Sequence, residues 1–227
     1  MSIRHHPDET TLIDYATDAL DDAANLVVAS HVALCADCRK AVRTFECLGG
    51  SLLASMAPGA ASAGPVPEND LAAWDETRDL PEQERPAQTA DADAPTSRPG
   101  TALPAQVAAL LAQYPDQDWK WLGPGIRWKP LINPGEDGIR TFLLKAQPGT
   151  AMPQHRHEGI EWTQVLTGAF AHEFGRYGPG DFDDADETLE HRPIVERGGE
   201  CICIVAMKGQ LQLQGLFGRL MQPFVRF

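Results

Sequence analysis

The sequence is short of positive charge and of long apolar runs. Its 19 Lys and Arg residues face 32 Asp and Glu residues, which gives a net charge of −13 at pH 7. Direct binding to nucleic acid is not expected, because neutralising phosphates requires clustered Lys and Arg. No apolar run approaches the roughly 18 residues that a membrane helix needs. No hydrophobic signal core follows the first residues either, so we expect a cytoplasmic protein.

Cysteines are few and odd in number. The five include a CxxC pair, Cys35 and Cys38, and a CxC pair, Cys201 and Cys203. An odd set of this kind fits a reducing compartment better than a disulfide scaffold. At 227 residues and 43% hydrophobic composition, the chain is long enough for two modest globular domains.

The first part of the chain has a helical pattern, with apolar residues recurring every three to four positions. The start and stop signals predict helices that begin at Asp8 or Thr10, after Asp21–Asp22 and near Asp37, the last ending at Gly49–Gly50. A fourth short helix is expected over residues 68–77. We therefore assign residues 1–79 to a small helical domain.

The rest of the chain changes character twice. Residues 80–102 are rich in Pro, Ala and polar groups, which predicts a flexible linker. After a short helix near Gln106–Gln113, Pro and Gly separate short apolar runs, several of which alternate with period two. That pattern predicts a β-sandwich or barrel over residues 103–227, and so a multidomain α + β chain.

A candidate metal site lies in the helical part. His31, Cys35 and Cys38 are spaced i, i+4, i+7, so one helix would place them on a single face. Two thiolates and an imidazole suit tetrahedral Zn²⁺, with His5 or His6 of the preceding arm as fourth ligand. The alternatives are packing of small core residues and a redox CxxC pair, although the βαβ pattern of a thioredoxin-like motif is missing.

The arrangement His6…His31-x3-Cys35-x2-Cys38 on a helical domain resembles the zinc-binding anti-sigma domain. Domains of that family grip an extracytoplasmic-function sigma factor and keep it from RNA polymerase. The resemblance implies that His6, His31, Cys35 and Cys38 are the four zinc ligands and that His5 is a neighbour.

A second candidate metal site lies in the β-rich part. Residues 149–168 match the first cupin motif, G-x5-H-x-H-x3-E-x6-G, at every fixed position. Residues at i and i+2 of a strand face the same side, so His155 and His157 are both expected to point into the barrel. Glu161, on the adjoining strand, would complete a facial N2O set of the kind used for Zn, Fe, Mn or Ni.

The second cupin motif is recognisable but altered. Residues 175–181 supply its strand and turn, but the next histidine is His191, after the acidic stretch 181–190 that we interpret as a solvated loop. We predict His191 as the fourth barrel ligand, with His172 as the competitor. Cys201 and Cys203 share one strand face, either projecting towards the metal as redox-sensitive groups or packing as inert residues.

A zinc anti-sigma domain followed by a cupin resembles the ChrR-type anti-sigma factors over nearly the whole chain. The resemblance implies a negative regulator, not an enzyme, that sequesters a group IV sigma factor. Its cupin, holding zinc or another divalent metal, would be needed for release under singlet oxygen or related oxidative stress. In structural terms, we expect the helices near Leu12–Leu34 and Phe45–Leu53 to wrap between regions of the sigma factor and to bind it through their apolar faces.

Two other functions compete with this hypothesis. A metal centre with three His and one Glu could serve a cupin dioxygenase or isomerase, but no general base or substrate clamp is identifiable beyond the ligands. A small-molecule sensor with a helical dimerisation arm is the third. A neighbouring gene for a small sigma factor would favour the regulator, and turnover of an organic substrate with Fe²⁺ would favour the enzyme.

Overall fold

The computed structural model describes residues 3–56, 105–113, 118–134 and 138–213. The fourth helix predicted over 68–77 and the linker predicted over 80–102 lie outside these ranges. Residues 1–48 and 100–227 form one compact unit, whereas residues 49–99 form another, of which only the end of a helix is described. No helix among the described residues is long and apolar enough to cross a membrane.

Three helices at the N-terminus and one short helix before the barrel confirm the predicted helical pattern. Their bounds are α1, Glu9–Ala16; α2, Asp22–Leu34; α3, Ala36–Ser55; and α5, Ala105–Leu111. The Asp8 side chain caps α1 by accepting from Thr11 N at 2.6 Å, and the Asp21 side chain caps α2 by accepting from Ala24 N at 2.7 Å. These bonds satisfy amides that have no partner within the helix.

The predicted helix stop at Gly49–Gly50 is wrong, since α3 continues to Ser55. Neither glycine takes the left-handed backbone conformation that ends many helices. A glycine inside a helix costs only about 1 kcal/mol relative to alanine, which the favourable residues around it offset.

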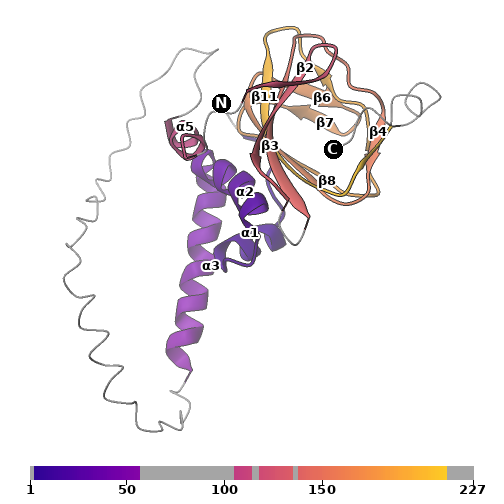
Figure 1. Ribbon diagram of the computed structural model, residues 1–227. Coiled ribbons are helices and arrows are strands. Elements are labelled where there is room, and N and C mark those ends of the chain that lie inside the picture. The colour runs from indigo at the N-terminus through magenta and orange to yellow at the C-terminus, as the bar shows by residue number, and fades with distance from the viewer. Residues whose placement is uncertain (1–2, 57–104, 114–117, 135–137, 214–227) are drawn as a thin grey trace, which may run out of the picture. The chain divides into compact units, whose positions relative to one another are not determined.

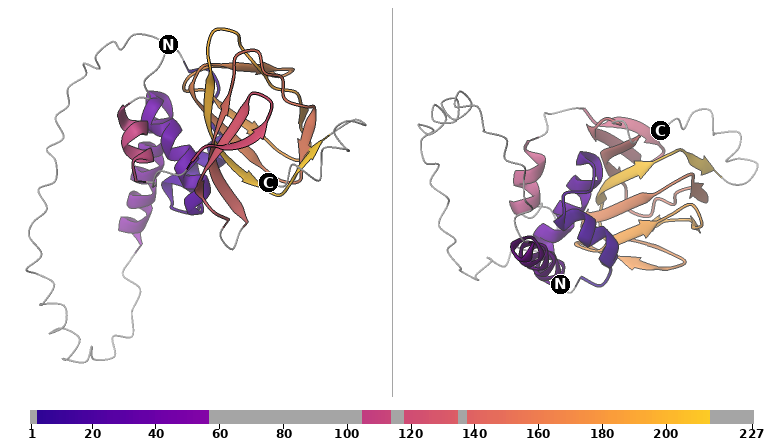
Figure 2. Two further views of the ribbon diagram at one scale, coloured as in Figure 1. Left: turned by 45° about the horizontal axis from the view of Figure 1, so that its top comes forward. Right: turned by 90° about the horizontal axis from the view of Figure 1, so that it is seen from below.

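The β-rich part is a barrel of short strands, as predicted (Figures 1 and 2). The strands are β1, Lys120–Gly123; β2, Ile126–Ile132; β3, Ile139–Ala146; β4, His155–His157; β5, Glu161–Thr167; β6, Phe170–His172; β7, Gly175–Tyr177; β8, Phe182–Ala185; β9, Glu190–His191; β10, Ile194–Val195; β11, Cys201–Lys208; and β12, Leu211–Leu213. They form a six-stranded sheet in the order β1-β2-β3-β11-β5-β8 and two three-stranded sheets, β10-β6-β7 and β12-β4-β9.

Strand β11 lies inside the large sheet and is buried on both faces, which explains its nearly continuous apolar run. Cys201, Cys203 and Val205 face the barrel interior, where they pack in one core cluster. Ile204 and Ala206 face outward into a second cluster that also holds apolar residues of α2. The helix α2 lies against the strands of this sheet (Figure 1). Sheets covered on both sides read as continuous rather than alternating hydrophobic runs.

This second cluster also buries one face of α2. α2 packs against β3, β5 and β11, and its Leu26, Val27 and Val28 are at most 4% exposed. The apolar face expected near Leu12–Leu34 for a sigma factor is therefore largely covered by the barrel of the same chain.

The acidic stretch 181–190 is not simply a solvated loop. Asp181 and Asp183 are 5% and 4% exposed, and β8 runs through the stretch. Strand alternation explains the burial of Asp183, which lines the barrel interior while Asp184 is exposed. Asp181 precedes β8 and is buried against the N-terminal arm, whose backbone it binds.

Candidate metal centres

The N-terminal cluster is built at the junction of two helices. α2 ends at Leu34, Cys35 is extended with φ −95° and ψ 111°, and α3 begins at Ala36. The expectation that one helix carries His31, Cys35 and Cys38 is therefore wrong. The break lets the Cys35 Sγ accept a hydrogen bond from Cys38 N at 3.5 Å, so that both thiols turn towards the imidazole of His31.

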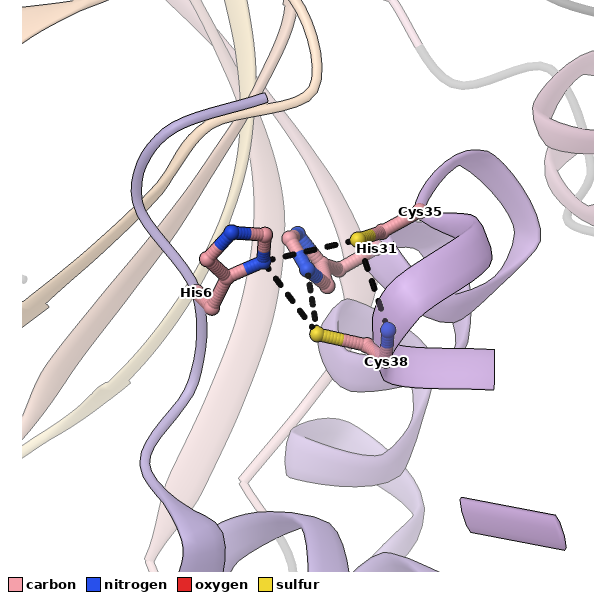
Figure 3. A group of neighbouring side chains, drawn as sticks. All are labelled: His6, His31, Cys35 and Cys38. Atoms are coloured by element: carbon pink, nitrogen blue, oxygen red, sulfur yellow. Dashed lines mark hydrogen bonds between the residues drawn. The ribbon is translucent and has the colours of Figure 1, made fainter. Parts of the chain in front are cut away.

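The fourth member of the cluster comes from the N-terminal arm. His6 Nδ1 lies 3.4 Å from Cys35 Sγ and 3.3 Å from Cys38 Sγ, while His31 Nε2 lies 3.2 Å from Cys38 Sγ (Figure 3). One donor atom from each of these residues lies within 4.8 Å of all the others. Tetrahedral zinc with ordinary Zn–N and Zn–S bonds places its donor atoms about 3.3–3.8 Å apart, so the set fits such an ion.

His5 points elsewhere. Its ring packs on the Tyr177 ring with centroids 4.3 Å apart. Of the two histidines of the arm, His6 is therefore the one placed with the thiols.

Burial shapes the charge state of this cluster. It raises the pKa of the Cys38 thiol to about 12, so the thiolate needs a cation beside it at neutral pH. It lowers the pKa of His31 to about 4, which keeps that imidazole neutral, the form that binds metals. Three of the four donors are buried, and His6 is the exposed one.

The barrel cluster is held by two paired strands. His155 and His157 of β4 both face inward, and His155 lies directly opposite His191 of β9 in the ladder. The Nε2 atom of His191 is 3.0 Å from that of His155 and 3.1 Å from that of His157. Metal–nitrogen bonds of about 2.1 Å give neighbouring donors separations of about 3.0–3.4 Å, so these three imidazoles also fit a metal ion.

Hydrogen bonding and burial prepare the same three rings. His155 Nδ1 donates to Pro153 O at 2.8 Å, which leaves its Nε2 lone pair for a metal. Burial lowers the pKa of His155, brings that of His157 to about 4 and that of His191 to about 3. All three are neutral at physiological pH.

Glu161 lies beside this cluster rather than among its converging nitrogens. Its Oε2 is 3.4 Å from Nδ1 of His157, and its Oε1 accepts a hydrogen bond from Thr163. Burial raises the pKa of Glu161, so a neighbouring cation would stabilise its charged form. Its role as a ligand stays a prediction.

His172 is already committed to other partners. Its Nδ1 accepts from Phe174 N at 3.2 Å, so Nε2 carries the proton that is donated to Asp183 at 3.0 Å. A metal would need a lone pair on one of these nitrogens. These hydrogen bonds favour His191 over His172 as the ligand.

Cys201 and Cys203 lie on one face of β11, as expected, with their sulfur atoms 3.7 Å apart. The hydrogen bond with Cys201, together with burial, raises the pKa of Cys203 well above its ordinary value. Both thiols line a cavity of about 30 Å³ that Glu161 and His191 also border. The pair therefore lies close to the barrel cluster, and its part in function is untested.

Sequence reasoning missed two barrel residues that contact the N-terminal cluster or its arm, Gln164 and Asp181. His31 Nδ1 lies 2.9 Å from Gln164 Oε1, and Asp181 Oδ1 accepts from the backbone of Arg4 and His5. A signal for the first was present: once Glu161 faces inward, alternation turns Gln164 outward, onto a face that is otherwise apolar.

Comparisons with known proteins agree with this architecture. Residues 107–212 match the family model described as the ChrR cupin-like domain. The anti-sigma-E factor ChrR of Cereibacter sphaeroides is 39% identical over 231 residues, covering 100% of both chains. The solved structure of Rhodobacter sphaeroides SigE in complex with the anti-sigma ChrR matches with a TM-score of 0.69 and 36% identity, covering 91% of this chain and 100% of that one.

Proposed function

The chain belongs to the ChrR family of anti-sigma factors, and we propose that it binds an extracytoplasmic-function sigma factor and holds it inactive. The observation that carries this function is the 39% identity to an anti-sigma factor over the full length of both chains. The solved relative is itself in complex with a sigma factor. The chain is a regulator rather than a cupin enzyme, and it acts in the cytoplasm, where RNA polymerase uses its sigma factors.

The N-terminal cluster binds Zn²⁺ in this proposal, through His6, His31, Cys35 and Cys38. The support is chemical: two thiols and two imidazoles converge at separations suited to a tetrahedral ion. Zinc there would fix the break between α2 and α3 and tie the arm to both helices. The metal would thereby organise the part of the chain that meets the sigma factor.

The end of α3 supplies a contact surface for the partner. Leu48, Leu52, Leu53 and Met56 are 57–73% exposed and follow one another at helical spacing. Exposed apolar stripes of this kind bind grooves of partner proteins. We assign this stripe, rather than the covered face of α2, to the sigma factor.

The barrel binds Zn²⁺ or another divalent metal through His155, His157 and His191, with Glu161 as the further ligand. Three converging neutral imidazoles support this assignment, but several ions accept such a set. Oxidative chemistry at the barrel, of the singlet-oxygen type, would favour release of the sigma factor by shifting the chain to a state with weaker affinity. Residues 1–79 would thus carry inhibition and 103–227 sensing, with 80–102 between them.

Replacing His31, Cys35 and Cys38 together tests the role of zinc. The triple variant is expected to lose one zinc equivalent and to bind its partner extracytoplasmic-function sigma factor at least about 100-fold more weakly, because structural zinc contributes folding free energy directly. Metal analysis and titration calorimetry measure both quantities. A complex of unchanged affinity would contradict zinc as the organiser.

A single charge in the stripe tests the contact surface. Leu52→Asp is expected to weaken sigma binding at least about tenfold, because buried apolar anchors dominate interfaces. Ser51→Asp places the same charge on the neighbouring exposed position and serves as the control. Equal affinity for both variants would place the interface elsewhere.

A further inference from the structure

The two clusters lie on opposite faces of the same pair of strands. β5 and β8 are paired, with Thr163 opposite Asp183 and Gln164 opposite Phe182. Thr163 and Asp183 line the interior cavity next to His191. Phe182, on the other face, meets the ring of His31 edge-on with centroids 5.7 Å apart. One layer of backbone therefore separates the barrel interior from the N-terminal cluster.

Gln164 contacts His31 through a defined atom. Its Nε2 donates to Val165 O at 3.2 Å, so its Oε1 is the atom that faces His31 Nδ1 at 2.9 Å. Gly180 O, 3.0 Å away, is a second acceptor for the same N–H. His31 Nδ1 is therefore the protonated nitrogen, which leaves the Nε2 lone pair directed at the thiols. Both side chains are fully buried, so water cannot replace these acceptors.

Asp181 holds the arm that carries His6. Its Oδ1 accepts from Arg4 N at 2.6 Å and from His5 N at 3.1 Å, and its Oδ2 accepts from Gly178 N at 2.8 Å. The backbone continues the attachment, because Phe182 N donates to His5 O at 3.1 Å. The exposed ligand thus owes its position to the turn before β8.

We propose that Gln164 and Asp181 are positioning residues of the N-terminal metal site, so that the barrel supplies the outer shell of a site whose four ligands all lie outside it. This inference rests on the proposed function, in which that cluster binds zinc. Outer-shell acceptors fix the tautomer and orientation of a ligating imidazole, and their loss typically weakens metal affinity 10- to 100-fold. How long the N-terminal site keeps its metal then depends on contacts from β5 and from the turn before β8.

A matched pair of variants at one position tests the role of Gln164. The full-length chain is loaded with Co²⁺, whose thiolate charge-transfer band reports the Cys-containing site, and the band is followed after addition of a chelator. Gln164→Leu removes the acceptor and is expected to speed metal release about tenfold, since Gly180 O remains. Gln164→Glu keeps an acceptor oxygen and is expected to release metal no faster than the unmodified chain.

Further variants separate positioning from packing. Ile204 lies directly opposite Gln164 in the β5–β11 ladder, so Ile204→Val removes one buried methyl group beside Gln164 but leaves its acceptor oxygen in place. Its release rate is expected to be unchanged. Asp181→Ala is expected to speed release and to alter the cobalt d–d bands, because His6 is no longer held near the thiols.

Each contrary outcome has its own meaning. Release from Gln164→Leu at the unmodified rate would overturn the inference, as would equally fast release from Gln164→Glu. A chain that shows no cobalt–thiolate band at all would instead overturn the zinc assignment in the proposed function.

Discussion

The two candidate metal clusters differ in what holds their side chains in place. In the barrel, His155 and His191 lie opposite each other in a strand ladder, and all three imidazoles are buried. In the N-terminal cluster the side chains come from an arm, a helix, a helix break and a second helix, and one of them, His6, is exposed. A ladder fixes its side chains through repeated backbone hydrogen bonds, whereas the N-terminal cluster brings together side chains from separate elements that share only a few such bonds.

The difference predicts that the barrel cluster is organised without a metal, whereas the N-terminal cluster would depend on the zinc proposed for it. A site that is organised without its metal binds the ion with little rearrangement of the fold. A site that is organised by its metal couples loss of the ion to a change in conformation. A regulator that must release a partner needs such a coupling.

Metal removal gives the largest expected effect and tests this contrast directly. Chelation should free α3, which buries only Cys38 and Val42 among its residues, while α2 stays docked through its apolar core. Amide hydrogen exchange in residues 36–55 is expected to accelerate at least about 100-fold, with little change in residues 22–34. Exchange that stayed slow throughout α3 would show that the helix break holds without its metal.

Substitutions in the barrel give the next largest effect. His191→Ala should remove the barrel metal, whereas His172→Ala should weaken its binding at most about tenfold, because both ring nitrogens of His172 are already hydrogen-bonded, to Phe174 N and to Asp183. Metal analysis of both variants after dialysis measures the difference. The metal retained by the N-terminal site of the same chain serves as the internal control. If His172→Ala lost the metal and His191→Ala kept it, the ligand assignment would be reversed.

The barrel was the more predictable half, for a physical reason. His155 and His157 are two positions apart on one strand, so strand alternation alone places them on the same face. The motif that contains them is short and continuous in the sequence. The structure confirms that both side chains face the interior. The inward turn of Asp183 follows the same rule, but the acidic composition around it suggested a solvated loop instead.

The helical half was harder, because its geometry depends on contacts distant in sequence. A spacing of i, i+4, i+7 predicts one continuous helix. The helix instead ends before Cys35, and the start of the next helix places Cys38 N within hydrogen-bond distance of Cys35 Sγ. Arg39 then donates to Val32 O and Ala33 O, satisfying carbonyls that the break exposes. The docking of α2 on the barrel was also out of reach, because no local signal says which surface covers an apolar helix face.

Acid should weaken both clusters with the same sign. The folded-state pKa is about 4 for His31 and His157 and about 3 for His191, against 6.5 for an unperturbed histidine. Between those pH values the unfolded chain binds more protons than the folded chain. The free energy of unfolding is therefore highest above pH 6.5 and decreases as the pH falls towards 4. Protons also compete with metal for the same nitrogens, which adds to the loss.

Urea denaturation of the metal-loaded chain from pH 7.5 to 4.5 measures this effect. The free energy of unfolding is expected to fall by several kcal/mol across the range, in step with metal release. A flat profile would mean that these imidazoles stay as accessible to protons in the folded chain as in the unfolded one.

The smallest expected effect concerns α2 alone and separates helix stability from metal binding. Asp21→Ala removes the cap bond to Ala24 N and should cost about 1 kcal/mol of unfolding free energy, whereas Asp22→Ala, which makes no cap bond, should cost about 0.3 kcal/mol. Neither variant should lose metal, because the barrel core and the bond from His31 to Gln164 hold the far end of α2. Thermal unfolding and metal analysis check both points. Loss of the N-terminal metal in Asp21→Ala would mean that the cluster depends on the whole helix and not on the barrel wall behind it.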